Sequence, residues 1–192
     1  MKSKIYVYID GQNLILGTKK SKYKWNIDLR SFYHYLENKF RVKKAFYFIG
    51  VKDKKFEKLH KYIESCGFIV RFREHIACQK SHKKGNVDTD IIFDIMKRFY
   101  ESPNSQFILV TQDGDYIKLV KHLIKHRRLI KIIFPNAKKA SVLYRKLHTR
   151  YWMDLSTLDL IRKLGKRSSM PPGARGTVSP KGNSPQDPRL GD

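Results

Sequence analysis

Residues 106–119 place two aspartates shortly after an apolar run, and this arrangement limits the folds open to the chain. Phe107–Val110 is apolar and rich in β-branched residues, which predicts a strand buried on both faces. The run stops at Thr111-Gln112, and Asp113 and Asp115 come next, separated by Gly114, which permits a tight turn into a helix. The sequence therefore predicts two acids at the carboxyl end of a buried strand, where open α/β sheets bind their ligands.

Further aspartates occupy similar places elsewhere in the chain. Asp10 follows the apolar residues 4–9, and the start of a predicted helix over 91–99 carries the three acids Asp88, Asp90 and Asp94. One acid at a helix start needs no functional explanation, because it caps the helix or favours its dipole. Helix capping hardly requires three acids in one helix, so we expect an acidic pocket where these segments meet.

The order of predicted elements points to one fold class. Strands are expected at 4–9, 42–49, 68–72, 107–110 and 129–134, and helices at 29–36, 56–63, 91–99, 119–123, 142–147 and 155–164. This alternation predicts an α/β, three-layer (Rossmannoid) sandwich around a central, mainly parallel five-stranded sheet. We expect one domain over residues 1–164. The composition then changes to Pro, Gly, Ser and Arg, which predicts a disordered basic tail over residues 165–192.

The charge of the chain indicates a polyanionic partner. The formal net charge is +24, from 41 Lys+Arg against 17 Asp+Glu, which favours nucleic acid over an anionic membrane surface. No apolar run approaches the ~18 residues of a membrane helix, and residues 5–9 are too short for a signal peptide. Two cysteines favour a reducing, cytoplasmic location. Zinc is disfavoured, because Cys66, His75, Cys78 and His82 match no standard ligand spacing.

Two basic segments are candidates for contact with RNA. The segment 19–24 interleaves lysines with Tyr23 and is followed by Trp25, which suits phosphates and stacked bases, although an ordinary solvated loop fits equally well. A second segment, 74–84, is rich in Lys and His. The lysines that we expect to bind RNA are Lys19, Lys20, Lys22, Lys24, Lys83 and Lys84.

An acidic pocket on a basic protein calls for a metal ion. Two carboxylates ~4 Å apart repel each other by roughly 4 kcal/mol at an effective dielectric of 20. Hard divalent cations with oxygen ligands, Mg²⁺ or Mn²⁺, would relieve this repulsion. Positive surface around carboxylate-bound metal is the arrangement that cleaves a phosphodiester with a metal-activated water.

Three segments of the chain resemble the acidic motifs of a known family. They are Tyr8–Leu14, Lys84–Asp90 and Val110–Tyr116, and together they look like the motifs of the NYN domain family, in the LabA-like branch of the PIN-like nucleases. The resemblance covers roughly residues 4–150. One departure is visible, because Thr111-Gln112 stands where the family often has Ser-Gly.

The resemblance implies a PIN-like fold and a metal-dependent ribonuclease acting on RNA, expected to be single-stranded. Carried over by position, Asp10, Asp88, Asp90, Asp113 and Asp115 would bind metal, and Asn13 would orient water or phosphate beside the catalytic acids Asp10, Asp88, Asp113 and Asp115. An RNA-binding module without turnover is the competing interpretation. A phospho-acceptor signalling domain ranks third, because Lys131 lies inside a predicted strand and not at its end.

Overall fold

The computed structural model describes residues 3–50, 54–73 and 87–166, and these form one parallel sheet with helices around it. The strands are β1 (Lys4–Asp10), β2 (Lys44–Ile49), β3 (Ile69–Phe72), β4 (Ser105–Val110), β5 (Leu129–Phe134) and β6 (Trp152–Asp154). The α-helices are α1 (Gly11–Lys19), α2 (Leu29–Phe40), α3 (Glu57–Ser65), α4 (Asp88–Glu101), α5 (Ile117–Lys125) and α6 (Leu158–Leu164). The predicted α/β class is confirmed, with six strands in place of five.

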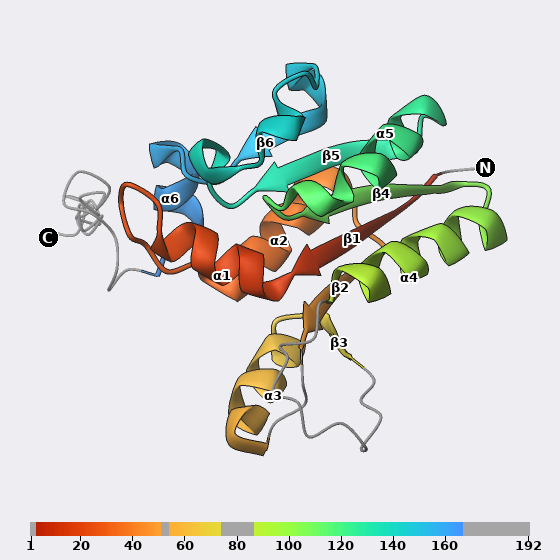
Figure 1. Ribbon diagram of the computed structural model, residues 1–192. Helices are drawn as coiled ribbons and strands as arrows, with labels where there is room; N and C mark the ends of the chain where they lie inside the picture. The colour runs from red at the N-terminus through yellow and green to blue at the C-terminus, as the bar shows by residue number, and fades with distance from the viewer. Residues whose placement is uncertain (1–2, 51–53, 74–86, 167–192) are drawn as a thin grey trace, which may run out of the picture.

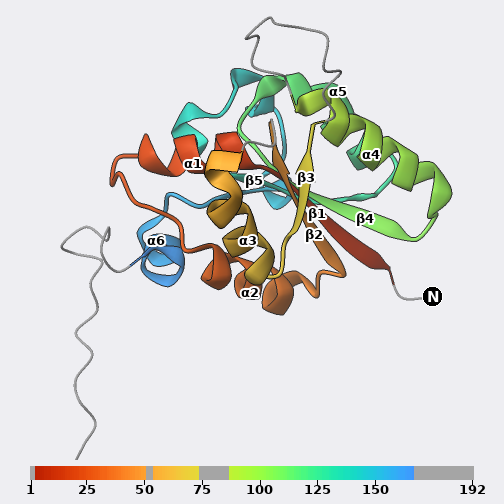
Figure 2. The same cartoon turned by 90° about the horizontal axis from the view of Figure 1, so that it is seen from below.

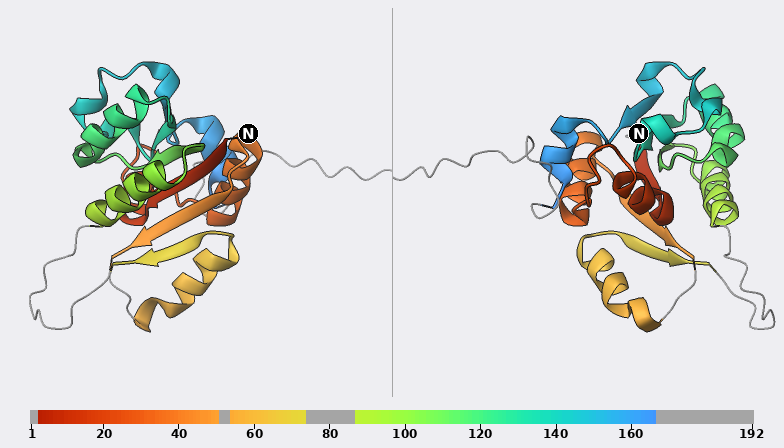
Figure 3. Two further views of the ribbon diagram at one scale, coloured as in Figure 1. Left: turned by 90° about the vertical axis from the view of Figure 1, so that its right-hand side faces the viewer. Right: turned by 60° about the vertical axis from the view of Figure 1, so that its left-hand side comes forward.

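A hydrophobic core lies between the sheet and the helices on each of its two faces. One core packs side chains such as Val7 and Ile108 against α1, α2, α3 and α6, and the other packs Tyr8 and Leu109 against α4 and α5. Successive residues of β1 and β4 thus enter opposite cores, as expected for strands covered on both faces. Figures 2 and 3 show α4 and α5 on one side of the strands and α2 and α6 on the other.

The strand order brings the two acid-bearing strands together. The order is β3-β2-β1-β4-β5-β6, so β1 pairs with β4 although a large part of the chain separates them. At this pair the chain changes direction across the sheet, which in α/β folds opens a crevice at the carboxyl ends of the strands. Figure 1 shows β1, β4 and β5 ending on the same side, beside α1.

Helix α1 was not among the predicted helices. Its residues include Gly11, Asn13 and Gly17, which are weak helix formers. Asp10 caps it, because its carboxylate accepts a 2.9 Å hydrogen bond from the Asn13 amide. Gly11 is needed for the close approach to β2, since a β-carbon there would lie 2.3 Å from the Tyr47 ring. The helix therefore starts directly at the end of β1.

The carboxyl-terminal part differs from expectation in detail. The predicted helix 142–147 is instead a 3-10 turn, η4 (Val142–Tyr144), between two others, η3 (Ala137–Lys139) and η5 (Thr149–Tyr151). The helix predicted for 155–164 starts later, at Leu158, because the short strand β6 precedes it. Gly165 pairs with Ile27 in an isolated bridge. Residues 167–192, most of the predicted tail, lie outside the described residues, so the tail and the domain boundary at 164 stay predictions.

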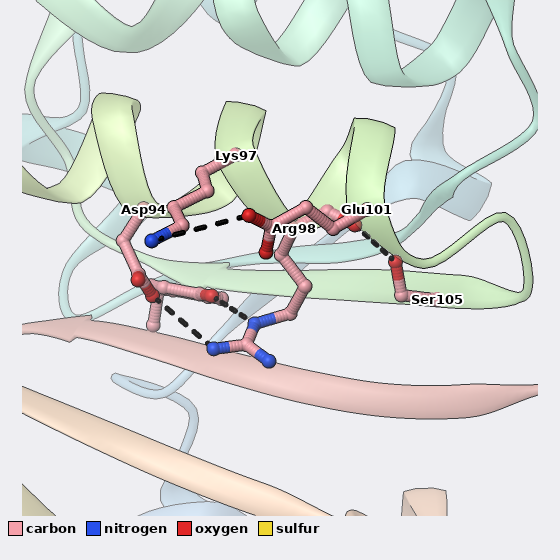
Figure 4. Close-up of polar contacts among 6 residues, drawn as sticks. Asp94, Lys97, Arg98, Glu101 and Ser105 are labelled. Atoms are coloured by element: carbon pink, nitrogen blue, oxygen red, sulfur yellow. Dashed lines mark hydrogen bonds and ion pairs between the residues drawn. The ribbon is translucent and has the colours of Figure 1, made fainter.

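Helix α4 is attached to the sheet by an arginine. Arg98 donates a 2.9 Å hydrogen bond to the Tyr8 hydroxyl, and its guanidinium lies 4.4 Å from the centre of the Tyr6 ring. Asp94, one turn earlier, forms an ion pair with it at 3.7 Å, whereas Lys97 and Glu101 pair on the exposed side of the helix (Figure 4). These contacts hold α4 over β1 and so fix where its first residue, Asp88, lies.

No helix in the described ranges is both long enough and apolar enough to cross a membrane.

Candidate active site

Three aspartates from two distant segments meet at the carboxyl end of β4. Asp88, Asp113 and Asp115 each offer a carboxylate oxygen, and these oxygens lie within 4.8 Å of one another. Asp88 is the buried first residue of α4, Asp113 caps the 3-10 turn η2 (Gly114–Tyr116), and Asp115 is exposed within that turn. The structure thus joins two of the three acidic motifs seen in the sequence.

Asp10 lies in the same cavity as these three acids, although it is not part of the close group. Asn13 holds it through two hydrogen bonds to its carboxylate, from the backbone at 2.9 Å and from the side-chain amide at 2.5 Å. Burial raises the pKa of Asp10 above its usual value, the bonds from Asn13 oppose that rise, and the charges of Asp88 and Asp113 add to it. The carboxylates are therefore near enough to repel one another, but burial is the larger cause.

The acids line a cavity of ≈ 410 Å³ at the end of the sheet. Its walls also hold one cation, Lys20, and several polar or apolar side chains. The full lining is Asp10, Gln12, Asn13, Leu16, Lys20, Val87, Asp88, Gln112, Asp113 and Asp115. Asp10, Asp113 and Asp115 form no ion pair with any other described residue. Four carboxylates and one ammonium group line the cavity, so negative charge outweighs positive charge there.

Two buried tyrosines position the acids, and the sequence analysis did not single either of them out. The Tyr116 hydroxyl donates a hydrogen bond to a carboxylate oxygen of Asp88, and the Tyr144 hydroxyl donates to the backbone carbonyl of Asp113. Burial raises the pKa of both hydroxyls, and nearby aspartates raise it further, so both stay protonated donors. Both tyrosines also pack in the core, so their pattern in the sequence is that of ordinary buried aromatics.

A second cavity, of ≈ 440 Å³, adjoins the acidic one. The two share Asn13, Gln112, Asp113 and Asp115 as a common wall. The other side of the second cavity is formed by Gly114, Lys139, Ser141 and Leu143. The sequence analysis missed Lys139, because the strand end after β5 carries no acid to draw attention to it. The acidic cavity therefore continues into a space with a cation and an apolar side chain.

Two further acids lie apart from the cluster. Asp90 does not line the cavity and is not in the close group, and its Oδ2 atom is buried without a hydrogen-bond partner among the described residues. Asp94 pairs with Arg98 beneath α4. Asp90 and Asp94 are four residues apart and so lie on one face of α4. Asp88 lies on a different face of the helix.

The predicted RNA-binding lysines fall into three groups. Lys20 lines the acidic cavity, whereas Lys19, Lys22 and Lys24 are exposed beside α1. Lys83 and Lys84 lie outside the described residues. One expectation is wrong: Trp25 is fully buried in the core and is not available to stack on a base.

Two residues of the disfavoured alternatives, Cys66 and Lys131, are described, and neither lines the acidic cavity. Cys66, the zinc candidate that is described, is buried in the core, and the other three candidates lie outside the described ranges. Lys131 lies inside β5, with its ammonium on the backbone carbonyl of Arg150.

The acidic cluster suits a hard divalent cation. All of its candidate ligand atoms are carboxylate oxygens, which Mg²⁺ and Mn²⁺ prefer over nitrogen or sulfur. The described side chains also leave the charges of Asp113 and Asp115 without an ion pair, which a bound cation would balance. The residues present therefore fit a bound Mg²⁺ or Mn²⁺.

Comparison with known proteins agrees with this fold. A crystal structure of a protein of unknown function from Vibrio parahaemolyticus superposes with a TM-score of 0.66 at 21% sequence identity, covering 80% of this chain and 93% of that one. No match was found among curated proteins. The sequence matches the NYN domain over residues 4–153, a span that contains all four acids of the cavity. The chain therefore belongs to the NYN domain family and has its PIN-like α/β fold.

Proposed function

We propose that this protein is a metal-dependent ribonuclease that hydrolyses RNA phosphodiester bonds at the acidic cavity. The observation that carries the proposal is the meeting of Asp88, Asp113 and Asp115 within 4.8 Å, in a chain whose net charge is +24. A surface this basic attracts a polyanion, but these acids would repel its phosphates unless a cation lay between them. Membership of the NYN domain family supports the same conclusion.

The acids of the cavity, Asn13 and Lys20 each have a role in this proposal. Asp88, Asp113 and Asp115, together with Asp10, would hold Mg²⁺ or Mn²⁺. The ion would supply an activated water and neutralise charge on the phosphate. Asn13 is fixed by its bond to Asp10, so its side-chain oxygen is oriented to accept a hydrogen bond from a water. Lys20, on the cavity wall, would bind a phosphate of the substrate backbone.

Several finer assignments belong to the proposal as well. Asp90 is proposed as a further metal ligand on the resemblance alone, since it lies outside the close group. Exposed Lys19, Lys22 and Lys24, with Lys83 and Lys84, would contact the RNA backbone further from the cavity. The RNA is proposed to be single-stranded, the protein cytoplasmic, and its place within the family the LabA-like branch.

An RNA-binding module without turnover is the second candidate. Its supporting observation is that the charge and the exposed lysines beside α1 would bind RNA whether or not the acids hold a metal. Such binding would be steeply salt-dependent, with a log–log slope of ~0.7 for each phosphate contact on a single strand. The two candidates therefore differ in turnover and in the need for metal, but not in affinity for RNA.

Cleavage of a labelled single-stranded RNA separates the two. We expect cleavage with Mn²⁺ or Mg²⁺ and none with a chelator. We also expect the Asp113→Asn variant to bind RNA as well as the wild type and to cut it at least about a hundredfold more slowly, since loss of an outer-shell partner alone costs metalloenzymes 10–100-fold. RNA binding by the wild type without metal-dependent cleavage would leave the binding module as the function.

A further inference from the structure

The second cavity is continuous with the acidic one and differs from it in chemistry. The four shared residues, Asn13, Gln112, Asp113 and Asp115, separate a compartment lined by acids from one that holds Lys139, Ser141 and Leu143. Its volume of ≈ 440 Å³ is within the range of small-ligand sites. An RNA strand with one phosphate at the acids would therefore continue directly into the second cavity.

The floor of the second cavity is attached to the loop that carries the acids. Ser141 donates its amide to the Gln112 carbonyl at 3.0 Å, and the Tyr144 hydroxyl donates to the carbonyl of Asp113. Gly114 approaches Ser141 so closely that a β-carbon at 114 would lie 2.5 Å from the Ser141 Oγ. These three contacts hold Ser141 and η4 against residues 112–114, so the space is formed before any ligand arrives.

Its walls offer two kinds of contact at once. Lys139 is an exposed cation that suits a phosphate, and it lies at the end of η3, which Asn136 caps through its bond to the Lys138 amide at 3.2 Å. Leu143 is 51% exposed although it is apolar, which suits the flat face of a base. Gln112 lines both cavities, but its Oε1 atom is buried beside Gly17, so the base contact rests on Leu143.

We infer that the second cavity is a nucleotide subsite, which takes the base and phosphate of the residue next to the phosphate held at the acids. This inference rests on the proposed function for the place of the neighbouring phosphate. A base that lies on Leu143 must be unstacked and unpaired, so the subsite selects an unpaired nucleotide. Lys139 then contributes one phosphate contact, and Leu143 contributes contact with a base of either size.

Two matched pairs of variants test the subsite by RNA binding alone. Fluorescence anisotropy of a labelled single-stranded RNA dodecamer with cleavage-resistant linkages, in Mn²⁺, is compared between Lys139→Gln and Lys138→Gln. Both lysines are exposed, but only Lys139 lines the cavity. We expect Lys139→Gln to weaken binding several-fold and to reduce the salt slope by ~0.7, the value for one lost phosphate contact, with a smaller change in Lys138→Gln.

The second pair is Leu143→Ser against Val142→Ser, two exposed apolar neighbours of which only Leu143 lines the cavity. A dodecamer of the same length without bases serves as the second probe. We expect Leu143→Ser to weaken binding of the normal strand about fivefold, by loss of contact with one base, and to leave the abasic strand unaffected. Lys139→Gln should weaken both strands equally, because its contact is with the backbone.

These experiments measure RNA binding and not turnover, so a failure of the subsite can be distinguished from a failure of the proposed ribonuclease activity. Equal effects of Lys139→Gln and Lys138→Gln would show only general surface charge and would overturn the phosphate contact. Equal losses for Leu143→Ser on normal and abasic strands would overturn the base contact. Melting curves of all four variants, each altered at an exposed side chain, should match the wild type.

Discussion

Helix α4 carries aspartates in two contrasting environments. Asp94 lies against the sheet, where Arg98 pairs with it at 3.7 Å and the Tyr8 hydroxyl is a further neighbour. Asp88, at the first residue of the helix, meets two other carboxylates, Asp113 and Asp115, and accepts a hydrogen bond from Tyr116. The middle of the helix pairs an acid with a base, whereas its first residue meets other acids.

This contrast shows that an aspartate marks a site by what surrounds it, not by its own charge. Arg98 balances the charge of Asp94 within the protein, so Asp94 needs no ligand. The cluster at Asp113 raises that free energy through repulsion, and a cation bound only by the folded state would reverse the effect. Changes at Arg98 and changes at the acidic cluster should therefore act on different properties, stability in the first case and metal binding in the second.

The largest effect in this comparison is expected for Tyr116→Phe. Loss of the hydroxyl removes the donor that orients the Asp88 carboxylate, and loss of such an outer-shell partner typically lowers metal affinity 10–100-fold. The metal concentration for half-maximal cleavage should rise, while cleavage at saturating metal recovers much of the wild-type rate. A purely structural role would instead lower the melting temperature and leave the metal dependence unchanged.

Arg98→Met should affect the part of the helix that packs on the sheet. The substitution removes the 2.9 Å bond to Tyr8 and the stacking over Tyr6, and should cost about 2 kcal/mol of unfolding free energy. The matched control is Lys97→Met, which breaks an exposed pair with Glu101 and should cost less than about 0.5 kcal/mol. Urea unfolding measures both. Similar costs for the two variants would show that Arg98 does not anchor the helix.

A smaller effect, which depends on pH, is expected at Asp10. Its pKa in the folded state lies above the unfolded value, chiefly because of burial. Such a group contributes stability below the unfolded pKa of 3.8, and that contribution is lost as pH rises through the raised folded value. Asn at position 10 cannot ionise, so the Asp10→Asn variant does not lose this contribution. Without metal, the melting temperature of the variant minus that of the wild type should therefore increase as pH rises from 3.5 to 7. A difference that stays constant with pH would contradict this account.

The sequence predicts the position of the acids better than it predicts the surface around them. Asp10 and Asp113 each end an apolar run, and parallel strands bring such ends to one edge of the sheet, so a shared pocket follows from pattern alone. The pairing of β1 with β4 does not follow, because it depends on which face each crossover helix covers. The strand order is a tertiary choice that local periodicity does not record.

The features that the sequence analysis missed are short or locally ambiguous. Strand β6 has three residues, too few for a period to appear, and 142–147 has helical spacing but forms only a 3-10 turn. Trp25 lies in a basic segment, where charge suggested exposure, yet it is fully buried. Tyr116 and Lys139 act through contacts between distant segments, which spacing along one segment does not reveal.

Binding of Mn²⁺ to three metal-free proteins tests the central claim most directly. The wild type, Asp113→Asn and Asp94→Asn are titrated with Mn²⁺, and the free ion is followed by its electron paramagnetic resonance signal. We predict that wild type and Asp94→Asn bind Mn²⁺ with the same affinity and that Asp113→Asn binds at least about tenfold more weakly, in line with the cost of disturbing a metal site. Equal binding by all three proteins, or no binding by the wild type, would contradict the account.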